Sequence, residues 1–190
     1  AQRDDGIGVV RLHALDGARR RRIGISRDRG QSGGGGGFPL PMGGGKLDLG
    51  TLSQTVGAVS ISASAASGDT ILNGNLTGTS YAVSNSTGNV VISANLLGTG
   101  TFTKSGAGTV TLFGANLYNG LTTVSEGTLV FGTATTLTSA NNVTLSGTGT
   151  LDINGFSPTI GTFASAATNL ITNSSAGMGA STATTLGTPS

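Results

Sequence analysis

Apolar residues recur in short clusters along the chain from Gly45 onward, and a glycine precedes each cluster. Val, Leu, Ile, Phe and Thr fill the clusters, whereas Gly, Asn and Ser separate them, which favours strands and turns over helices. No stretch keeps apolar residues at the i, i+3, i+4 and i+7 spacing of a helix without an intervening glycine. The pattern therefore predicts an all-β domain over 45–190.

The clusters return at a nearly constant interval. The glycines that begin them are Gly45, Gly68, Gly88, Gly108, Gly127 and Gly149, and a further apolar cluster follows at Leu170 and Ile171. A strand that returns about every 20 residues indicates a solenoid, because each repeat buries its apolar face only by stacking on its neighbours. Coils of this length with Gly and Asn corners suit a right-handed parallel β-helix. We expect about six or seven coils, on the order of 30 Å in length.

Period-2 alternation within 98–132 assigns the two faces of the predicted strands. The inward set is even-numbered and includes Phe102, Val110, Leu112, Tyr118 and Val124, and most threonines have the other parity: Thr101, Thr103, Thr109, Thr111 and Thr123. Leu117 and Leu121 break the alternation, so we expect them at corners or on the outer face. Asn95 and Asn116 are separated by about one coil, and we expect them to stack as an amide ladder at one corner.

The same stretch resembles the autotransporter-associated β-strand repeat, also called the passenger-associated transport repeat. The residues that match the motif of this family are Gly98, Gly100, Phe102, Lys104, Gly106, Gly108, Val110, Leu112, Gly114, Asn116, Tyr118, Gly120, Thr122, Val124, Gly127 and Leu129. Phe102 and Val110 stand where the motif has leucine, and Leu121 stands where the family commonly has a second glycine. Residues 147–163 resemble, more weakly, the sequence found between such repeats.

This resemblance implies a parallel β-helical stem in the secreted passenger of a Gram-negative autotransporter or a similar surface protein. It implies export through an outer-membrane translocator barrel, a cell-surface or extracellular location, and no catalytic residue, cofactor or metal. The barrel is not in this chain, so we expect a part of a longer passenger or a short surface protein with a misplaced start. An alternative function is adhesion or self-association, with host or matrix glycans as partners, and no nucleic acid is expected.

Charge divides the chain into two segments. Nine of the ten basic residues lie in the first 46. From Leu47 onward, the charged residues are Lys104 and the four carboxylates Asp48, Asp69, Glu126 and Asp152. Residues 1–44 combine the run Arg19–Arg22 with glycine-rich sequence, and they contain too few apolar groups to offset the entropy of ordering. We therefore expect a disordered basic tail over 1–44, of native or foreign origin. The arginines lack the interleaved aromatic residues typical of nucleic-acid binding.

The residues needed for catalysis are scarce. There is no cysteine, which excludes disulfides and thiolate metal sites, and the single histidine, His13, lies in the expected tail. A Ser-His-Asp arrangement therefore cannot form within the solenoid segment alone. Asp69, Glu126 and Asp152 are candidates for the carboxylate pair of a glycosidase, and the last two are just over one coil apart. Carbohydrate-active β-helices line their clefts with several Asp, Lys and Arg residues, which are missing here, so we expect no enzyme.

Three Thr-x-Thr strings suggest a further alternative, since ranks of threonine on a β-helix resemble ice-binding faces. The strings are Thr101-Phe-Thr103, Thr109-Val-Thr111 and Thr136-Leu-Thr138. They do not recur one coil apart on every repeat, and threonine is a common exposed residue in strands. We therefore expect these threonines to form ordinary outer faces of the solenoid.

Overall fold

The computed structural model of the 190-residue chain describes residues 11–16, 19–24, 39–42, 45–62, 70–134, 137–138, 140–166 and 169–175. This part of the chain contains strands and no α-helix, so it has no helix long and apolar enough to cross a membrane. The strands are β1 (Arg11–Asp16), β2 (Arg19–Gly24), β3 (Leu40–Met42), β4 (Lys46–Asp48), β5 (Ser53–Thr55), β6 (Ala58–Ile61), β7 (Thr70–Leu72), β8 (Asn75–Thr77), β9 (Ser80–Val83), β10 (Asn89–Ile92), β11 (Asn95–Leu97), β12 (Thr101–Lys104), β13 (Thr109–Leu112), β14 (Thr122–Val124), β15 (Thr128–Phe131), β16 (Val143–Leu145), β17 (Thr150–Asp152), β18 (Phe163–Ser165) and β19 (Leu170–Thr172).

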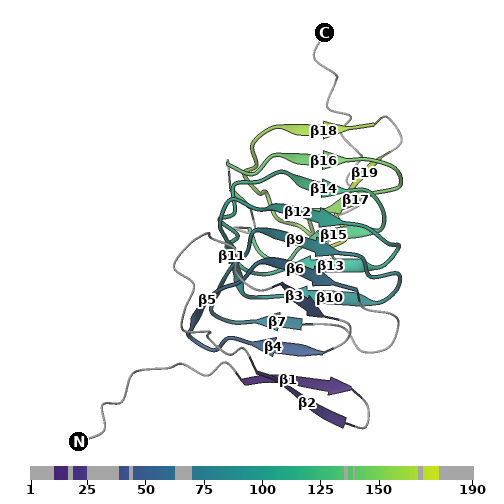
Figure 1. Ribbon diagram of the computed structural model, residues 1–190. Coiled ribbons are helices and arrows are strands. Elements are labelled where there is room, and N and C mark those ends of the chain that lie inside the picture. The colour runs from purple at the N-terminus through teal and green to yellow at the C-terminus, as the bar shows by residue number, and fades with distance from the viewer. Residues whose placement is uncertain are drawn as a thin grey trace, which may run out of the picture.

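Three sheets run along the solenoid, and we name them A, B and C (Figure 1). Sheet A contains β19-β17-β15-β13-β10-β7-β4-β1-β2, sheet B contains β18-β16-β14-β12-β9-β6-β3, and sheet C contains β11-β8-β5. The chain passes from sheet A through the side of sheet C to sheet B, and then returns to sheet A one coil further on. Each strand from β3 to β19 pairs in parallel with the equivalent strand of an adjacent coil. The predicted parallel β-solenoid is confirmed, and its handedness stays a prediction.

The pairing register gives the length of a coil. In sheet B, Val59 pairs with Tyr81, Tyr81 with Phe102, Phe102 with Thr122, and Thr122 with Val143. Each step along this row spans one coil of about 20 residues, which agrees with the interval between the glycines.

The glycine alignment fails at β4 and β7 of sheet A. It matches Ile71 to Val91, whereas the structure pairs Ile71 with Ile92 and Leu47 with Ile71. The reason is burial: Ile71 is fully buried, and a shift of one residue would turn it outward. From β10 to β17 the alignment holds, because Asn89, Thr109, Thr128 and Thr150 are in register.

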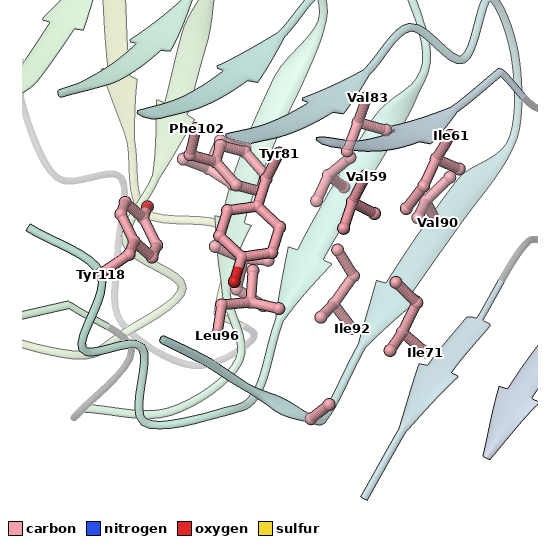
Figure 2. Packing of buried hydrophobic residues seen from close by; sticks show 14 of the residues in the cluster. Val59, Ile61, Ile71, Tyr81, Val83, Val90, Ile92, Leu96, Phe102 and Tyr118 are labelled. Carbon is pink, nitrogen blue, oxygen red and sulfur yellow. The ribbon is translucent and has the colours of Figure 1, made fainter. Parts of the chain in front are cut away.

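The core consists of inward rows of side chains that continue from coil to coil. Val90, Val110, Leu129 and Leu151 form one row of sheet A, and all four are buried. Figure 2 shows part of this core, where Val59 and Val83 of sheet B face Ile71 and Ile92 of sheet A. Burying each such side chain contributes roughly 1.5–3 kcal/mol before entropy is counted. The residues that the alternation turns inward in 98–132 are therefore buried, whereas Leu117 and Leu121 are exposed.

The first 44 residues contain three described strands. β1 and β2 pair antiparallel, and β1 pairs antiparallel with β4 through His13 and Lys46 (Figure 1). β3 joins the parallel ladder of sheet B at Leu40, ahead of the expected boundary. Composition alone did not indicate these strands. The expected disorder of the other residues of 1–44 falls outside the described residues, and the division at residue 44 stays a prediction.

We predict that Val110→Asp unfolds or aggregates the chain, because a buried carboxylate without a partner costs several kcal/mol. Thr109→Asp is the matched control, since Thr109 precedes Val110 on β13 and is only partly buried on the outer face. Thermal melts followed by circular dichroism measure both. Equal melting temperatures for the two variants would contradict the inward assignment of Val110.

Candidate functional site

The motif residues of 98–132 lie in β12 to β15 and in the corners between them. The side chains at Phe102, Val110, Leu112, Val124 and Leu129 form parts of the inward rows and are fully buried. The glycines of the motif occupy the corners: Gly98, Gly100 and Gly120 before sheet B, Gly106, Gly108 and Gly127 between sheets B and A, and Gly114 after sheet A. The motif thus contains two strands of sheet B and two of sheet A, and it covers most of two successive coils with their corners.

Glycines stack on one another where the chain enters sheet B. A Cβ on Gly120 would overlap the carbonyl oxygen of Gly100, and a Cβ on Gly100 would lie 2.6 Å from the carbonyl oxygen of Thr79. Contacts this short do not occur for real side chains. The close approach of three successive coils therefore requires a residue without a side chain at Gly100 and at Gly120.

Three aromatic rings lie next to one another inside the solenoid (Figure 2). The ring of Tyr118 lies 5.9 Å from that of Tyr81 and 6.0 Å from that of Phe102, measured between centroids. The Tyr81 hydroxyl accepts from the backbone N–H of Gly78 at 2.7 Å, and it lies 2.7 Å from the carbonyl oxygens of Leu76 and Leu97. Because Leu76 and Leu97 belong to successive coils, this side chain ties one coil to the next.

Thr122 is the only threonine in this inward row of sheet B among the described residues, and its hydroxyl contacts that of Tyr118. Thr122 lies in register between Phe102 and Val143 and is fully buried. Its hydroxyl is 2.7 Å from the Tyr118 hydroxyl, so the two polar groups satisfy one another. Burial raises the pKa of Tyr118, so the phenol stays protonated. Asn141 of the next coil donates to the Tyr118 carbonyl at 2.5 Å.

Lys104 is fully buried in an inward row of sheet B, between Val83 and Val124. Its ammonium donates to the carbonyl oxygens of Ser105 at 2.9 Å, of Gly106, and of Glu126 at 3.3 Å. Burial lowers the pKa of Lys104 from its ordinary value of 10.5 to about 8, while the charge of Glu126 opposes this shift. The lysine of the motif is therefore an internal hydrogen-bond donor.

The amide ladder involves a different pair from the expected one. Asn95 donates to Asn75 at 3.0 Å, and its side-chain oxygen accepts from the N–H of Ala115 at 2.9 Å. Asn116 is buried, and its oxygen accepts from the N–H of Leu96 at 3.0 Å. The expected Asn95–Asn116 stack is wrong because Ala115 occupies the position in register with Asn95, which turns Asn116 inward.

The comparisons with known proteins point to the same segment. The family profile described as passenger-associated-transport-repeat matches residues 102–131. This segment matches the passenger-associated-transport repeat. The resemblance seen in the sequence is confirmed for this segment, and the match begins at Phe102 and ends at Phe131. No curated protein and no solved structure matches the chain.

Carboxylates outside the passenger-associated-transport repeat stabilise corners after sheet A. Asp152 is buried and accepts from the N–H groups of Asn154 at 2.8 Å and Ser174 at 3.0 Å, and from the Ser174 hydroxyl. Asp48 likewise accepts from Gly50 at 3.1 Å and Asn73 at 2.8 Å. The hydrogen bond from Asn73, followed by that from Gly50, lowers the pKa of Asp48. Both aspartates thus join two coils at one corner.

The candidate carboxylate pair is not brought together. Asp152 pairs with Val130 in sheet A, whereas Glu126 precedes β15 at the corner of the passenger-associated-transport repeat. Asp69 lies outside the described residues, as does the side chain of His13. In the described part of the chain, no group of three or more His, Cys, Asp or Glu residues could hold a metal ion. Repeats of this family are structural, and the two described carboxylates lie apart in the register rather than as the candidate glycosidase pair.

The threonine strings lie on different faces. Thr101-Phe-Thr103 belongs to sheet B and Thr109-Val-Thr111 to sheet A, while Thr136 is outside the described residues. Thr111 and Thr103 pair with Val130 and Thr123 of the next coil, so neither string stacks on another Thr-x-Thr string. Single threonines do stack, as in Thr103, Thr123 and Thr144. This arrangement does not supply the array that the ice-binding alternative requires.

Sequence reasoning missed the polar side chains that fill the corners, notably Asn85, Asn141 and Asn169. Each donates through its amide to backbone carbonyl groups of a neighbouring coil, and Asn85 also donates to carbonyls of its own turn. The signal is weak because asparagine is common in this chain. One signal did exist for Lys104. It is even-numbered like Phe102, and the alternation therefore places its side chain on the inward face.

We predict that Tyr118→Phe lowers the free energy of unfolding by about 1–3 kcal/mol, because the buried Thr122 hydroxyl loses its partner. The double variant Tyr118→Phe, Thr122→Val should lose less than the sum of the two single variants, since both polar groups are then removed. Urea denaturation of the four chains measures this coupling. Strictly additive losses would show that the two hydroxyls do not interact.

We predict that the free energy of unfolding rises with pH between pH 8 and 10. In this window Lys104 is largely deprotonated in the folded chain but protonated in the unfolded chain, so the unfolded state binds more protons. Urea denaturation at each pH measures the slope, and the window stays below the ordinary pKa of tyrosine. The variant Lys104→Gln should have a flatter profile, and an unchanged slope would assign the effect to another group.

Proposed function

We propose that the chain is a non-enzymatic stem in the exported passenger of an autotransporter-like surface protein. In this role it holds a functional region away from a Gram-negative outer membrane, and its folding outside the cell helps to draw the passenger outward. The observation that carries the proposal is the match at 102–131, which spans β12 to β15 in two successive coils of a continuous parallel ladder. A translocator barrel would be the partner during export.

The organisation of the ladder supports this role. Each coil obtains its backbone hydrogen bonds from the coil before and the coil after it, so a folded coil is the template for the next. A chain that emerges progressively can therefore fold one coil at a time. Its stability rests on apolar rows and backbone pairing, with Lys104 and Asp152 as the buried charged residues among those described. Few charges then have to be paired before the coil closes.

Adhesion or self-association is a second candidate, and one surface feature favours it. Phe113, Leu117 and Leu121 belong to the same coil and are exposed by 44, 54 and 42%. Large apolar side chains exposed on one coil offer a candidate contact surface. This face would act in addition to the stem, because its side chains are not part of the inward rows.

The export role predicts that folding and display fail together. The chain is placed between a secretion signal and a translocator barrel, and surface display is measured by antibody binding and by protease sensitivity of intact cells. Val110→Asp should reduce display several-fold, whereas Thr109→Asp should be displayed like the unaltered chain. Equal display of both variants would contradict a contribution of solenoid folding to export.

Clumping of the displaying cells that is lost in Leu117→Ser, Leu121→Ser would identify the adhesive face.

A further inference from the structure

The corner between sheets B and A gathers backbone carbonyl oxygens around a side-chain nitrogen in several coils. Asn85 Nδ2 lies 3.3, 3.1 and 3.0 Å from the carbonyl oxygens of Thr87, Gly88 and Thr109. Asn169 Nδ2 lies 3.2, 3.0 and 3.2 Å from those of Ser146, Gly147 and Gly149. Each amide nitrogen thus has three acceptors that come from the same kind of corner.

Lys104 occupies the equivalent place between these two. Its three acceptors are the carbonyls of Ser105 and Gly106 in its own coil and of Glu126 in the next. The three donors enter from different positions: Lys104 ends β12, Asn85 follows β9, and Asn169 belongs to the coil after its acceptors. The feature they share is the ring of carbonyls, which we call the corner cage.

The path of the backbone explains why the cage needs a donor. The corner carbonyls accept from side-chain nitrogens, and a buried carbonyl without a partner is costly. In the coil between these cages, the backbone N–H of Thr148 donates to the carbonyl of Ser125 at 3.2 Å. Every corner between sheets B and A from β9 to β17 therefore has an N–H group directed at its carbonyls.

The corner cage is filled by an N–H donor in each of these coils, but the donor is not always charged. Two of the three side-chain donors are neutral amides. In Asn85 the nitrogen has three acceptors, whereas the side-chain oxygen is buried without a hydrogen-bond partner among the described residues. The cage therefore selects the donor end of the amide. The nearby carboxylate of Glu126 is exposed, and among the described residues it is the charged group that acts on Lys104.

We propose that the cage formed by Ser105, Gly106 and Glu126 is a binding site for a primary amine, that the Lys104 side chain is its built-in occupant, and that the cage requires N–H donors rather than positive charge. This inference stands independently of export, since it concerns only how the corner is closed. It assigns Lys104 the same task that Asn85 and Asn169 perform in other coils.

Two neutral variants of similar size separate the alternatives. Lys104→Gln keeps an N–H donor, and Lys104→Met keeps an apolar stem without one. At pH 7, Lys104→Met should lower the melting temperature by about 5 °C or more relative to Lys104→Gln, because three carbonyls lose their partner. Equal melting temperatures, or a higher value for Lys104→Met, would overturn the donor requirement.

A second arm supplies the amine from solution. Lys104→Ala is melted in propylammonium chloride and in tetramethylammonium chloride at the same ionic strength, because only the first cation carries N–H groups. We expect propylammonium to raise the melting temperature of Lys104→Ala and to leave Lys104→Gln unchanged relative to tetramethylammonium. The same shift in both variants, or no shift in Lys104→Ala, would overturn the binding site.

The unaltered chain provides a test that does not depend on a variant folding. Its two lysines are Lys46, which is solvent-exposed, and Lys104, which fills the cage. Brief acetylation with acetic anhydride followed by peptide mass spectrometry should modify Lys46 at least tenfold faster than Lys104. Denaturation in urea should remove the difference. Similar rates in the folded chain would show that the cage does not hold the amine.

Discussion

Each strand of the solenoid hydrogen-bonds to the equivalent strand one coil earlier, and this pairing determines where every corner must lie. The register in sheet B advances by one coil at each step, and the inward rows continue only if that step is kept. The stacked glycines at Gly100 and Gly120 follow from it, because successive corners must approach as closely as successive strands. The residue types of the motif thus reflect backbone geometry before they reflect any chemistry of their own.

The corners bring polar groups into the interior, and the side chains that meet them are specific. Thr122 is paired by Tyr118, and the carbonyls beside Gly106 are paired by Lys104. These residues lie in rows that are otherwise apolar, so each must satisfy its hydrogen bonds within the coil stack. A lysine in such a row destabilises the fold because its charge is buried. It also stabilises the fold because several carbonyls would otherwise lack a donor. The lowered pKa of Lys104 reflects the first of these effects.

Much of the architecture was accessible from the sequence, because alternation and glycine spacing are direct consequences of strand geometry. They predicted the parallel solenoid, the burial of Val110 and Leu112, and the exposure of Leu117. The polar contacts were less accessible. The ladder partner of Asn95 depends on a single-residue offset at the corner, and the register of Ile71 depends on which apolar residues face inward. The partners of Lys104 are carbonyl groups in turns. Residue spacing does not specify the path of the backbone through these turns, so the role of Lys104 could not be predicted from the sequence.

The constant register also governs how such a chain can change in length. Gain or loss of one whole coil preserves the order of sheets and the faces of the remaining strands. By contrast, gain or loss of one residue inside β13 would exchange Val110 with its outward neighbours and interrupt the rows on either side. Insertions and deletions are therefore tolerated in units of a coil within the ladder, and single-residue changes are confined to the outer loops. A molecule of this kind can be lengthened during evolution by duplicating a segment of its own gene, with no new fold to be found.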